Sequence, residues 1–226
     1  MIYETTVIGI QIVAKDTYEL AVVRPPGYVF RAGQYTQVQL PLLRKPDPKG
    51  NSRQFSIASA PCEVRTLRFV FRDTGSGYKT TALALTQGDP VVIESATGSF
   101  LLPCQSQQQH VFIAGGVGIA PFMSVLQECV LEGLEIPYAL VYGNQSPESA
   151  AYISFIRNVK SSHRTFEIQE LYKKPVPELF AKLVKKHSGS VWWIVGPSAM
   201  VATAVYGLKN AGINQSDIRT ESFIGY

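Results

Sequence analysis

The chain has 226 residues, 46% of them hydrophobic, which is enough for two modest cores, and its net charge of +4 is mild. Lysine and arginine form no run longer than a pair, which argues against nucleic-acid binding. No apolar run approaches the roughly 18 residues of a membrane-spanning helix, and the N-terminus lacks a secretion-signal pattern. Three distant cysteines, Cys62, Cys104 and Cys129, favour a reducing compartment, so we expect a cytoplasmic protein.

The first part of the chain, residues 1–104, has the pattern of antiparallel strands. Short β-branched segments alternate or run apolar between turn residues: TTVIGIQIVA, YELAVV, QYTQVQL, RTLRFVFR and DPVVIES. This pattern predicts a barrel or a sandwich. The segment PLLRKPDPKGN, residues 41–51, is expected to form an exposed loop inserted in this part.

The second part, residues 109–226, alternates strands with helices. Apolar strand segments precede predicted helices at residues 121–131 and 147–159 and a long helix that ends at Ala211. This rhythm is typical of a parallel sheet with helices on its faces. The polar segment CQSQQQ, residues 104–109, is the best candidate for a linker.

A glycine-rich turn follows the first strand of the second part, in FIAGGVGIAPFMSVL. Glycines let the backbone approach a pyrophosphate, and N–H groups at the start of a helix favour an anion. The turn therefore predicts a nucleotide site, although a tight strand-to-helix turn without a ligand is the alternative. No Lys-Ser/Thr pair follows the last glycine, so this is not a Walker loop. The candidate residues are Gly115, Gly116, Val117, Gly118 and Pro121.

Two later strands end in comparable turns, VYGNQSPESAAY and WWIVGPSAMV. In the first, Ser146 can cap a helix with Pro147 at its first position. Capping alone would explain both turns. With the glycine-rich turn they would line one cleft at the sheet edge, to which they add Gly143, Asn144, Gly196 and Pro197.

Eight segments stand in a characteristic order: FRAGQY, RQFSIAS, FRDTGSGYKTTAL, GDPVVIESATGSF, GGVGIAP, VYGN, VGPSAM and ESFIGY. Their order and spacing resemble the ferredoxin-NADP(H) reductase superfamily over nearly the whole chain. The resemblance implies an FAD-binding, six-stranded Greek-key β-barrel over residues 1–104. It also implies an α/β domain over residues 109–226 that binds NADH or NADPH.

The family pattern R-x-[YF]-S gives roles to the segment that contains Gln54. By resemblance, Arg53 would pair with the flavin pyrophosphate, Phe55 would lie against the isoalloxazine ring, and Ser56 would hydrogen-bond near flavin N5. A guanidinium, an aromatic face and a hydroxyl have the chemistry for these tasks. On composition alone, Phe55 as a core residue and Arg53 as a surface charge is the simpler interpretation.

The segment GSGYKTTAL resembles the second phosphate-binding segment of the family. Tyr78, Lys79 and Thr80 would bring an aromatic platform, a cation and a hydroxyl to the pyrophosphate and adenine end. Arg72, at the end of the preceding strand, is a further phosphate candidate. A solvated turn is the alternative interpretation of this segment.

The terminal ESFIGY matches the Glu-x-aromatic ending of the family. Glu221 would lie beside the nicotinamide and either orient its carboxamide or relay a proton. Phe223 would cover the flavin face and move aside before hydride transfer. Three residues follow Phe223, so Tyr226 is a rival for the covering role.

The sequence departs from the family at two positions. Val195 stands where many members have a cysteine near the reacting nicotinamide carbon, which puts the rate of hydride transfer in doubt. Gln145 stands where members often have an arginine for the ribose phosphate, so the local sequence does not support a preference for NADPH. Arg164, Lys173 or Lys174 could supply a cation from another loop.

These features predict a flavin-dependent NAD(P)H reductase that passes electrons to a separate carrier such as ferredoxin or flavodoxin, or to a small-molecule acceptor. A free-flavin reductase and a non-catalytic flavin-binding subunit or redox sensor are the alternatives. The three histidines are scattered without the spacing of metal ligands, so no metal site is expected. No G-x-S-x-G segment points to a hydrolase.

Overall fold

The structure, a computed structural model, describes residues 1–172, 175 and 177–223. The described chain divides into two compact units. The first comprises residues 1–102 together with helix α2 (Ala120–Leu131), and the second comprises residues 103–119 and the described residues from 132 onward. No described helix is both long and apolar enough to cross a membrane.

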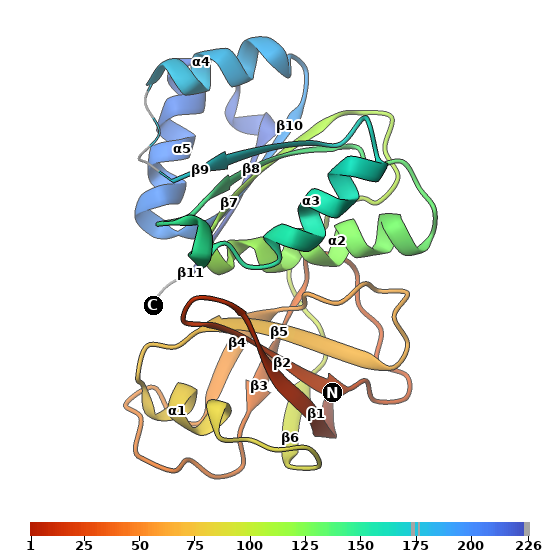
Figure 1. The fold of residues 1–226 in the computed structure, drawn as a ribbon, viewed down its shortest axis with the longest axis vertical. Coiled ribbons are helices and arrows are strands. Elements are labelled where there is room, and N and C mark those ends of the chain that lie inside the picture. Colours follow the sequence, from red (N-terminus) through yellow and green to blue (C-terminus); the bar gives the residue numbers. More distant parts are fainter. Residues whose placement is uncertain (173–174, 176, 224–226) are drawn as a thin grey trace. The chain divides into compact units, whose positions relative to one another are not determined.

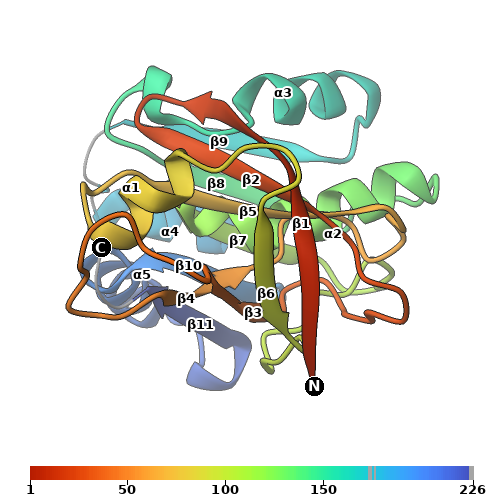
Figure 2. The ribbon, with the colours of Figure 1, turned by 90° about the horizontal axis from the view of Figure 1, so that it is seen from below.

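The first unit contains a six-stranded antiparallel sheet in the order β4-β3-β6-β1-β2-β5 (Figures 1 and 2). Its two edge strands meet through a bridge between Ile57 and Phe69, and the Ala58 N–H donates to the Arg68 carbonyl at 2.8 Å. The sheet is therefore closed in the manner of a barrel, as the alternating pattern predicted. Its strands are β1 (Ile2–Ala14), β2 (Thr17–Val23), β3 (Tyr35–Gln39), β4 (Ser52–Ser56), β5 (Thr66–Arg72) and β6 (Pro90–Glu94).

Aromatic and β-branched side chains fill the inside of the barrel. The alternation of each strand sends every second side chain inward, and these positions carry large apolar residues. Burial of each such side chain contributes about 1.5–3 kcal/mol. The largest fully buried members of this core are Leu20, Leu40, Ile57, Leu67, Phe69, Phe71 and Tyr78.

A short helix, α1 (Gly77–Leu83), follows β5 and belongs to the barrel unit. Ser76 caps it, because its hydroxyl accepts the Lys79 N–H at 3.2 Å. The side chain of Tyr78 enters the barrel core, where its hydroxyl donates to the Val38 carbonyl at 3.0 Å. The helix is thus fixed to the barrel by a buried anchor.

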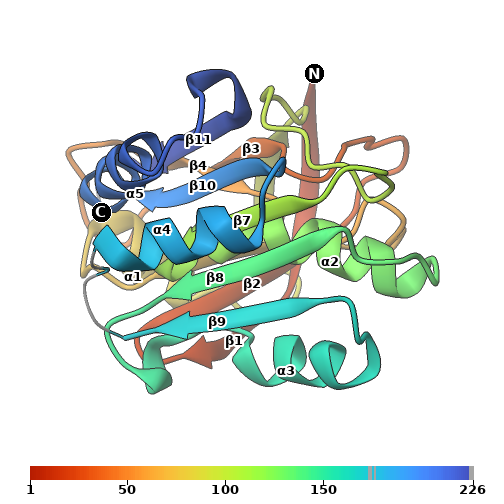
Figure 3. The ribbon, with the colours of Figure 1, turned by 90° about the horizontal axis from the view of Figure 1, so that it is seen from above.

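The second unit contains a five-stranded sheet in the order β11-β10-β7-β8-β9, and each neighbouring pair is parallel (Figure 3). Every residue of the central strand β7 is buried, as expected for a strand covered on both faces. The strands are β7 (His110–Gly115), β8 (Tyr138–Gly143), β9 (Glu167–Leu171), β10 (Val191–Pro197) and β11 (Ile218–Phe223).

Helices α4 (Pro177–Lys186) and α5 (Ser198–Asn210) share one core with β7, β10 and β11. Helix α3 (Ile153–Ser162) lies on the other face of the sheet (Figure 1). The prediction of an antiparallel barrel followed by a parallel sheet with helices is confirmed. Helix α4 was not predicted from the sequence.

The helix predicted for residues 147–159 is interrupted. A 3-10 turn, η2 (Pro147–Ser149), comes first, and α3 begins only at Ile153. Tyr152 between them has a φ of 59°, in the left-handed region, so the backbone changes direction there. The predicted helix at residues 121–131 agrees with α2, and the predicted long helix agrees with α5.

Candidate functional site

Arg53 and Asp47 form the centre of a polar cluster in the barrel unit. The Arg53 guanidinium lies 2.7 Å from an oxygen of the Asp47 carboxylate. The same carboxylate accepts the backbone N–H of Tyr78 and that of Lys49, each at 2.9 Å. A guanidinium and two backbone N–H groups therefore converge on one anionic group.

These donors lower the pKa of Asp47 well below its usual range. The N–H of Tyr78 is the largest cause, the N–H of Lys49 is the next, and the Arg53 guanidinium adds to them. The side chain of Asp47 is 2% exposed, so water does not compete for these bonds. A second face of the guanidinium is also engaged, since Arg53 lies over the Tyr78 ring at 4.9 Å and donates to the Ser52 carbonyl at 2.7 Å.

The cluster has the donor set that a phosphate group requires. Guanidinium and backbone N–H groups are the usual partners of phosphate oxygens, and here an internal carboxylate takes the place of such an anion. The predicted contact of Arg53 with a flavin pyrophosphate is consistent with this chemistry. Asp47 was not singled out by the sequence, because it lies in the proline-rich segment expected to be a simple exposed loop.

Three of the predicted flavin contacts are buried in the barrel unit: Phe55, Tyr78 and Lys79. Phe55 is 5% exposed and packs against Phe69, Phe71 and Tyr78. In the described structure Phe55 is a core residue, the alternative that composition had favoured. Its contact with an isoalloxazine ring stays a prediction.

Lys79 is buried between two aromatic rings. Its Nζ lies 4.6 Å from the ring centroids of both Phe55 and Phe71. Burial, together with the smaller effect of the nearby Arg53 charge, lowers the pKa of Lys79 to about 7. The Lys79 ammonium therefore makes cation–π contacts with both rings. Lys79 is part of the packing of the barrel interior, independently of any contact with a ligand.

The remaining predicted residues of the barrel unit are dispersed along their elements. Ser56 ends β4 and is 6% exposed, whereas Gln54 is exposed on the same strand. Thr80, in α1, and Arg72, the last residue of β5, are both half-buried. Their flavin contacts stay predictions.

The glycine-rich turn of the second unit is shaped by close packing. Residues Gly116–Ile119 form a 3-10 turn between β7 and α2, and Gly116 has a φ of 53°. A Cβ on Gly118 would lie 2.4 Å from the Val195 carbonyl oxygen, and one on Gly115 would lie 2.6 Å from the Met200 methyl group. These glycines are therefore required by the fold itself as well as by the predicted phosphate approach.

The ends of β8 and β10 lie on either side of the end of β7. Gly143 is the register partner of Gly115, and Val195 is the register partner of Ala114. The carboxyl ends of three parallel strands thus meet at one sheet edge, where ligands bind in such folds.

Each neighbouring segment contributes residues to this sheet edge. Gly196 has a φ of 157° and Pro197 ends β10, while Val117 is half-buried and Pro121 is the second residue of α2. The N–H of Asn144 donates to the Leu171 carbonyl at 2.9 Å. Both polar atoms of the Asn144 amide are buried, and neither has a hydrogen-bond partner among the described residues. Buried polar atoms without partners are uncommon in native proteins and are typical of positions that bind a ligand or water.

Glu221 lies on β11 beside this edge. It is the register partner of Val195 on β10, and its Oε2 is buried with no hydrogen-bond partner in the described part of the chain. Burial raises the pKa of Glu221 to about 7. A carboxyl group with this pKa exchanges its proton near neutral pH, as a proton relay requires. Phe223 ends β11 and is half-buried, whereas Tyr226 lies outside the described residues.

A second polar cluster, at the end of β9, was not found from the sequence. Arg157 on α3 donates two hydrogen bonds to Glu170, at 2.8 and 2.7 Å, and the Tyr172 hydroxyl also donates to Glu170. Glu170 is the register partner of Tyr142, next to Gly143. Of the cations considered from the sequence, Arg164 is exposed, and Lys173 and Lys174 lie outside the described residues.

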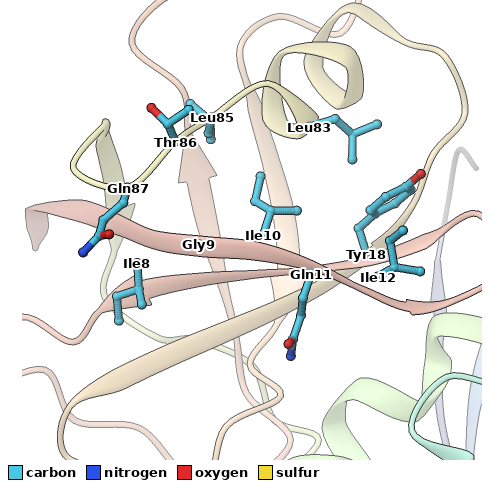
Figure 4. Close-up of a pocket in the computed structure, with 10 residues that line it drawn as sticks. All are labelled: Ile8, Gly9, Ile10, Gln11, Ile12, Tyr18, Leu83, Leu85, Thr86 and Gln87. Atoms are coloured by element: carbon cyan, nitrogen blue, oxygen red, sulfur yellow. The ribbon is translucent and has the colours of Figure 1, made fainter.

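A cavity of about 480 Å³ opens on the barrel unit (Figure 4). It lies between β1 and the segment after α1, and Ile10, Tyr18 and Leu85 are among its lining side chains. None of the ten lining residues was predicted to contact a flavin or a nucleotide. In the described chain, no cluster of three or more His, Cys, Asp or Glu side chains has the arrangement of a metal site.

The second half of the chain resembles a known family of nucleotide-binding domains. Residues 112–205 match the family model for the oxidoreductase NAD-binding domain. The chain is 25% identical to the phenol hydroxylase P5 protein of Acinetobacter pittii, over 98% of this chain and 65% of that protein. It is 24% identical to the reductase subunit of an aromatic O-demethylase of an Amycolatopsis species, over 96% of this chain and 68% of that protein. The chain thus spans about two thirds of the length of these relatives.

Solved structures share the fold. A cytochrome P450 reductase of Amycolatopsis superposes with a TM-score of 0.81 at 23% identity, over 98% of this chain and 70% of the other. A ferredoxin NADP⁺ reductase of Neisseria gonorrhoeae, crystallised with FAD and NADP, superposes with a TM-score of 0.79 at 22% identity, over 98% of both chains. The chain thus has the fold of these reductase structures, and residues 112–205 within it match an oxidoreductase NAD-binding domain.

Proposed function

We propose that the chain is an FAD-dependent NAD(P)H reductase that passes electrons to a separate carrier. The observation that supports this most directly is the convergence of Arg53 and the Tyr78 N–H on one anionic group in the barrel unit. The glycine-rich turn of an NAD-binding domain is present in the same chain. An anion-binding barrel joined to a pyridine-nucleotide domain is what transfer between the two cofactors requires.

In this proposal the barrel of residues 1–104 holds FAD, and residues 109–226 hold the pyridine nucleotide. Arg53 would neutralise the FAD pyrophosphate, and Ser56 would contribute a hydroxyl near the ring. FAD, when bound, accepts hydride from the nicotinamide and releases electrons singly. The chain supplies positioning and charge, because the redox chemistry belongs to the cofactor.

Glu221 and the strand ends would orient the nucleotide. The strand-end residues Gly115, Gly143 and Gly196 place no side chain at the sheet edge where its phosphates would bind, and the Asn144 amide offers a donor and an acceptor. Glu221, with its pKa near 7, can bind the nicotinamide carboxamide as a donor when protonated. Phe223 or Tyr226 would cover the flavin ring until the nucleotide arrives.

The acceptor is a separate protein of the ferredoxin or flavodoxin kind in this proposal, with a small molecule as the second possibility. The similar Amycolatopsis protein is by its name the reductase subunit of an aromatic O-demethylase, which supports a protein acceptor. The cysteine pattern supports a reducing, cytoplasmic compartment.

Anaerobic absorption spectroscopy of the purified chain, after incubation with FAD and removal of unbound flavin, tests the proposed function. We expect a retained flavin spectrum that bleaches on addition of NADH or NADPH, and then recovers when an oxidised ferredoxin or flavodoxin is added. A colourless protein that still reduces added free flavin would replace the proposal with a free-flavin reductase. A yellow protein that neither nucleotide bleaches would replace it with a non-catalytic flavin-binding subunit.

A further inference from the structure

The predicted pyrophosphate site of the barrel is already filled by the chain itself. The Asp47 carboxylate forms an ion pair with the Arg53 guanidinium at 2.7 Å and accepts a hydrogen bond from the Tyr78 N–H at 2.9 Å. The Asp47 side chain is 2% exposed and the Arg53 side chain is 17% exposed, so an incoming anion has to displace the carboxylate to bind both of these donors. The site therefore holds an internal competitor for a phosphate group.

The loop that carries Asp47 is hydrogen-bonded to α1 and to the residues just before and just after it. We name residues 44–50 the Asp47 loop; it joins β3 to β4 and passes beside α1 (Figures 1 and 2). Arg44 donates from its backbone N–H to the Thr81 hydroxyl at 2.9 Å and from its guanidinium to the Ala84 carbonyl at 3.1 Å. The Lys45 ammonium donates to the Gly75 carbonyl at 3.0 Å.

The backbone of the loop also covers the start of α1. A Cβ on Gly77 would lie 2.5 Å from the carbonyl oxygens of both Lys45 and Pro46. Only glycine permits an approach this close. The loop therefore lies directly on the segment that the sequence analysis assigned to the pyrophosphate.

We propose that the Asp47 loop is a strap that closes the anion site of the flavin-free barrel, and that FAD binds after its diphosphate displaces Asp47 from Arg53. The proposal rests on the proposed function. A diphosphate and a carboxylate cannot share one guanidinium and one N–H in this space, so the two compete. The apparent affinity for FAD is then lowered by the fraction of molecules in which the strap is closed.

The loop has the composition to move in this way. Gly50 has a φ of 72° at the end that joins β4, and Pro46 and Pro48, which flank Asp47, each have a fixed backbone φ. The loop also carries the cations Lys45 and Lys49 on either side of Asp47 in the sequence. Displacement would thus exchange one carboxylate for a phosphate without leaving the Arg53 charge uncompensated.

FAD binding to the full-length apoprotein tests the strap. The dissociation constants of FAD and of riboflavin, which lacks phosphate, are measured by quenching of flavin fluorescence for the wild type and for Asp47→Asn. We expect Asp47→Asn to bind FAD at least about fivefold more tightly, because a neutral amide competes less well for a guanidinium, with riboflavin unchanged. The matched control is Asp89→Asn: Asp89 also accepts a turn N–H, from Thr86 at 2.7 Å, but has no contact with Arg53.

The outcomes separate the strap from the proposed function. FAD binding by Asp47→Asn that equals or is weaker than that of the wild type overturns the strap alone and makes Asp47 a positioning residue for Arg53. Failure of every variant and of the wild type to bind FAD overturns both proposals. An equal gain in Asp89→Asn would show a general effect of net charge and would also overturn the strap.

Limited trypsin digestion of the wild type gives a second readout that needs no variant. Trypsin can cut after Arg44 and Lys49, whereas Pro46 protects the bond after Lys45. A strap that opens on ligand binding predicts faster cleavage at these two bonds when FAD is added. Protection of these bonds by FAD would overturn the proposal, because the loop would then close over the bound ligand.

Discussion

Val195 and Glu221 are register partners on the adjacent parallel strands β10 and β11. The position where many family members carry a cysteine is thus beside the carboxyl group that the resemblance places near the nicotinamide. Val195 is fully buried and offers no hydrogen bond, and Glu221 Oε2 has no partner among the described residues. The side chain of Val195 therefore gives the Glu221 carboxyl group no hydrogen bond, and burial is the cause of the raised pKa of Glu221.

Glu221→Gln should change the pH dependence of stability. The folded-state pKa of about 7 is above the usual 4.5, so the folded chain holds this proton more tightly than the unfolded chain. Stability therefore falls as the pH rises from about 4.5 to 7, and the ionised carboxylate costs about 3 kcal/mol above pH 7. We expect the variant to unfold at a higher urea concentration than the wild type at pH 8, and at a similar one at pH 4.5. A wild-type denaturation midpoint that does not change across this range would contradict the raised pKa.

Lys79→Met should act in a different pH window. Burial lowers the pKa of Lys79 from 10.5 to about 7, so wild-type stability should rise as the pH increases from 7 to 10.5. Methionine fills a similar volume between the Phe55 and Phe71 rings without a charge. We expect the rise to disappear in the variant, as measured by urea denaturation of the apoprotein at pH 7 and pH 10. Lys182→Met, on an exposed position of α4, is the control and should keep it.

Gly118→Ala should destabilise the second unit. Its methyl group would lie 2.4 Å from the Val195 carbonyl oxygen, and backbone atoms must shift to admit it. We expect a loss of about 2–4 kcal/mol in the free energy of unfolding, with weaker NADH binding. Gly9→Ala is the matched control, since a Cβ there has no heavy atom within 4 Å. Equal stability of the two variants would mean that the turn has room that the structure does not show.

Arg53→Gln should weaken the binding of FAD much more than the binding of riboflavin. It removes the charge that the proposed function assigns to the pyrophosphate, and we expect FAD to bind about tenfold or more weakly, with riboflavin little affected. Equilibrium dialysis of the apoprotein with each flavin measures the ratio. Because the substitution also leaves Asp47 without its guanidinium, circular dichroism must confirm that the barrel is folded. A parallel loss of both flavins would assign Arg53 to the structure of the site and not to the phosphate.

The sequence predicted the features of the site that depend on local pattern. The R-x-F-S strand, the glycine-rich turn after β7 and the Glu-x-Phe ending are each encoded within a few residues. The pairing of Asp47 with Tyr78 joins residues 31 positions apart through a loop with no periodicity, so no local signal marked it. Lys79 was predicted to contact the pyrophosphate, with a solvated turn as the alternative, and neither interpretation placed this lysine inside the barrel, where lysine is rare. Its neighbour Tyr78 draws the first turn of α1 into the barrel, and this tertiary contact overrides the usual preference.

Helix α2 shows that the chain returns to its first unit after the second has begun. Its Ser124 hydroxyl donates to the Ser59 carbonyl at 2.7 Å, and its Gln127 amide donates to the Ala58 carbonyl at 3.3 Å. During synthesis, the barrel unit therefore cannot complete its contacts when residue 104 leaves the ribosome, and must wait until residue 131 has emerged. A chain cut within the polar linker would leave the barrel without α2, and α2 without the surface that satisfies its buried serine. Completion of the first unit therefore depends on residues that are synthesised after the second unit has begun.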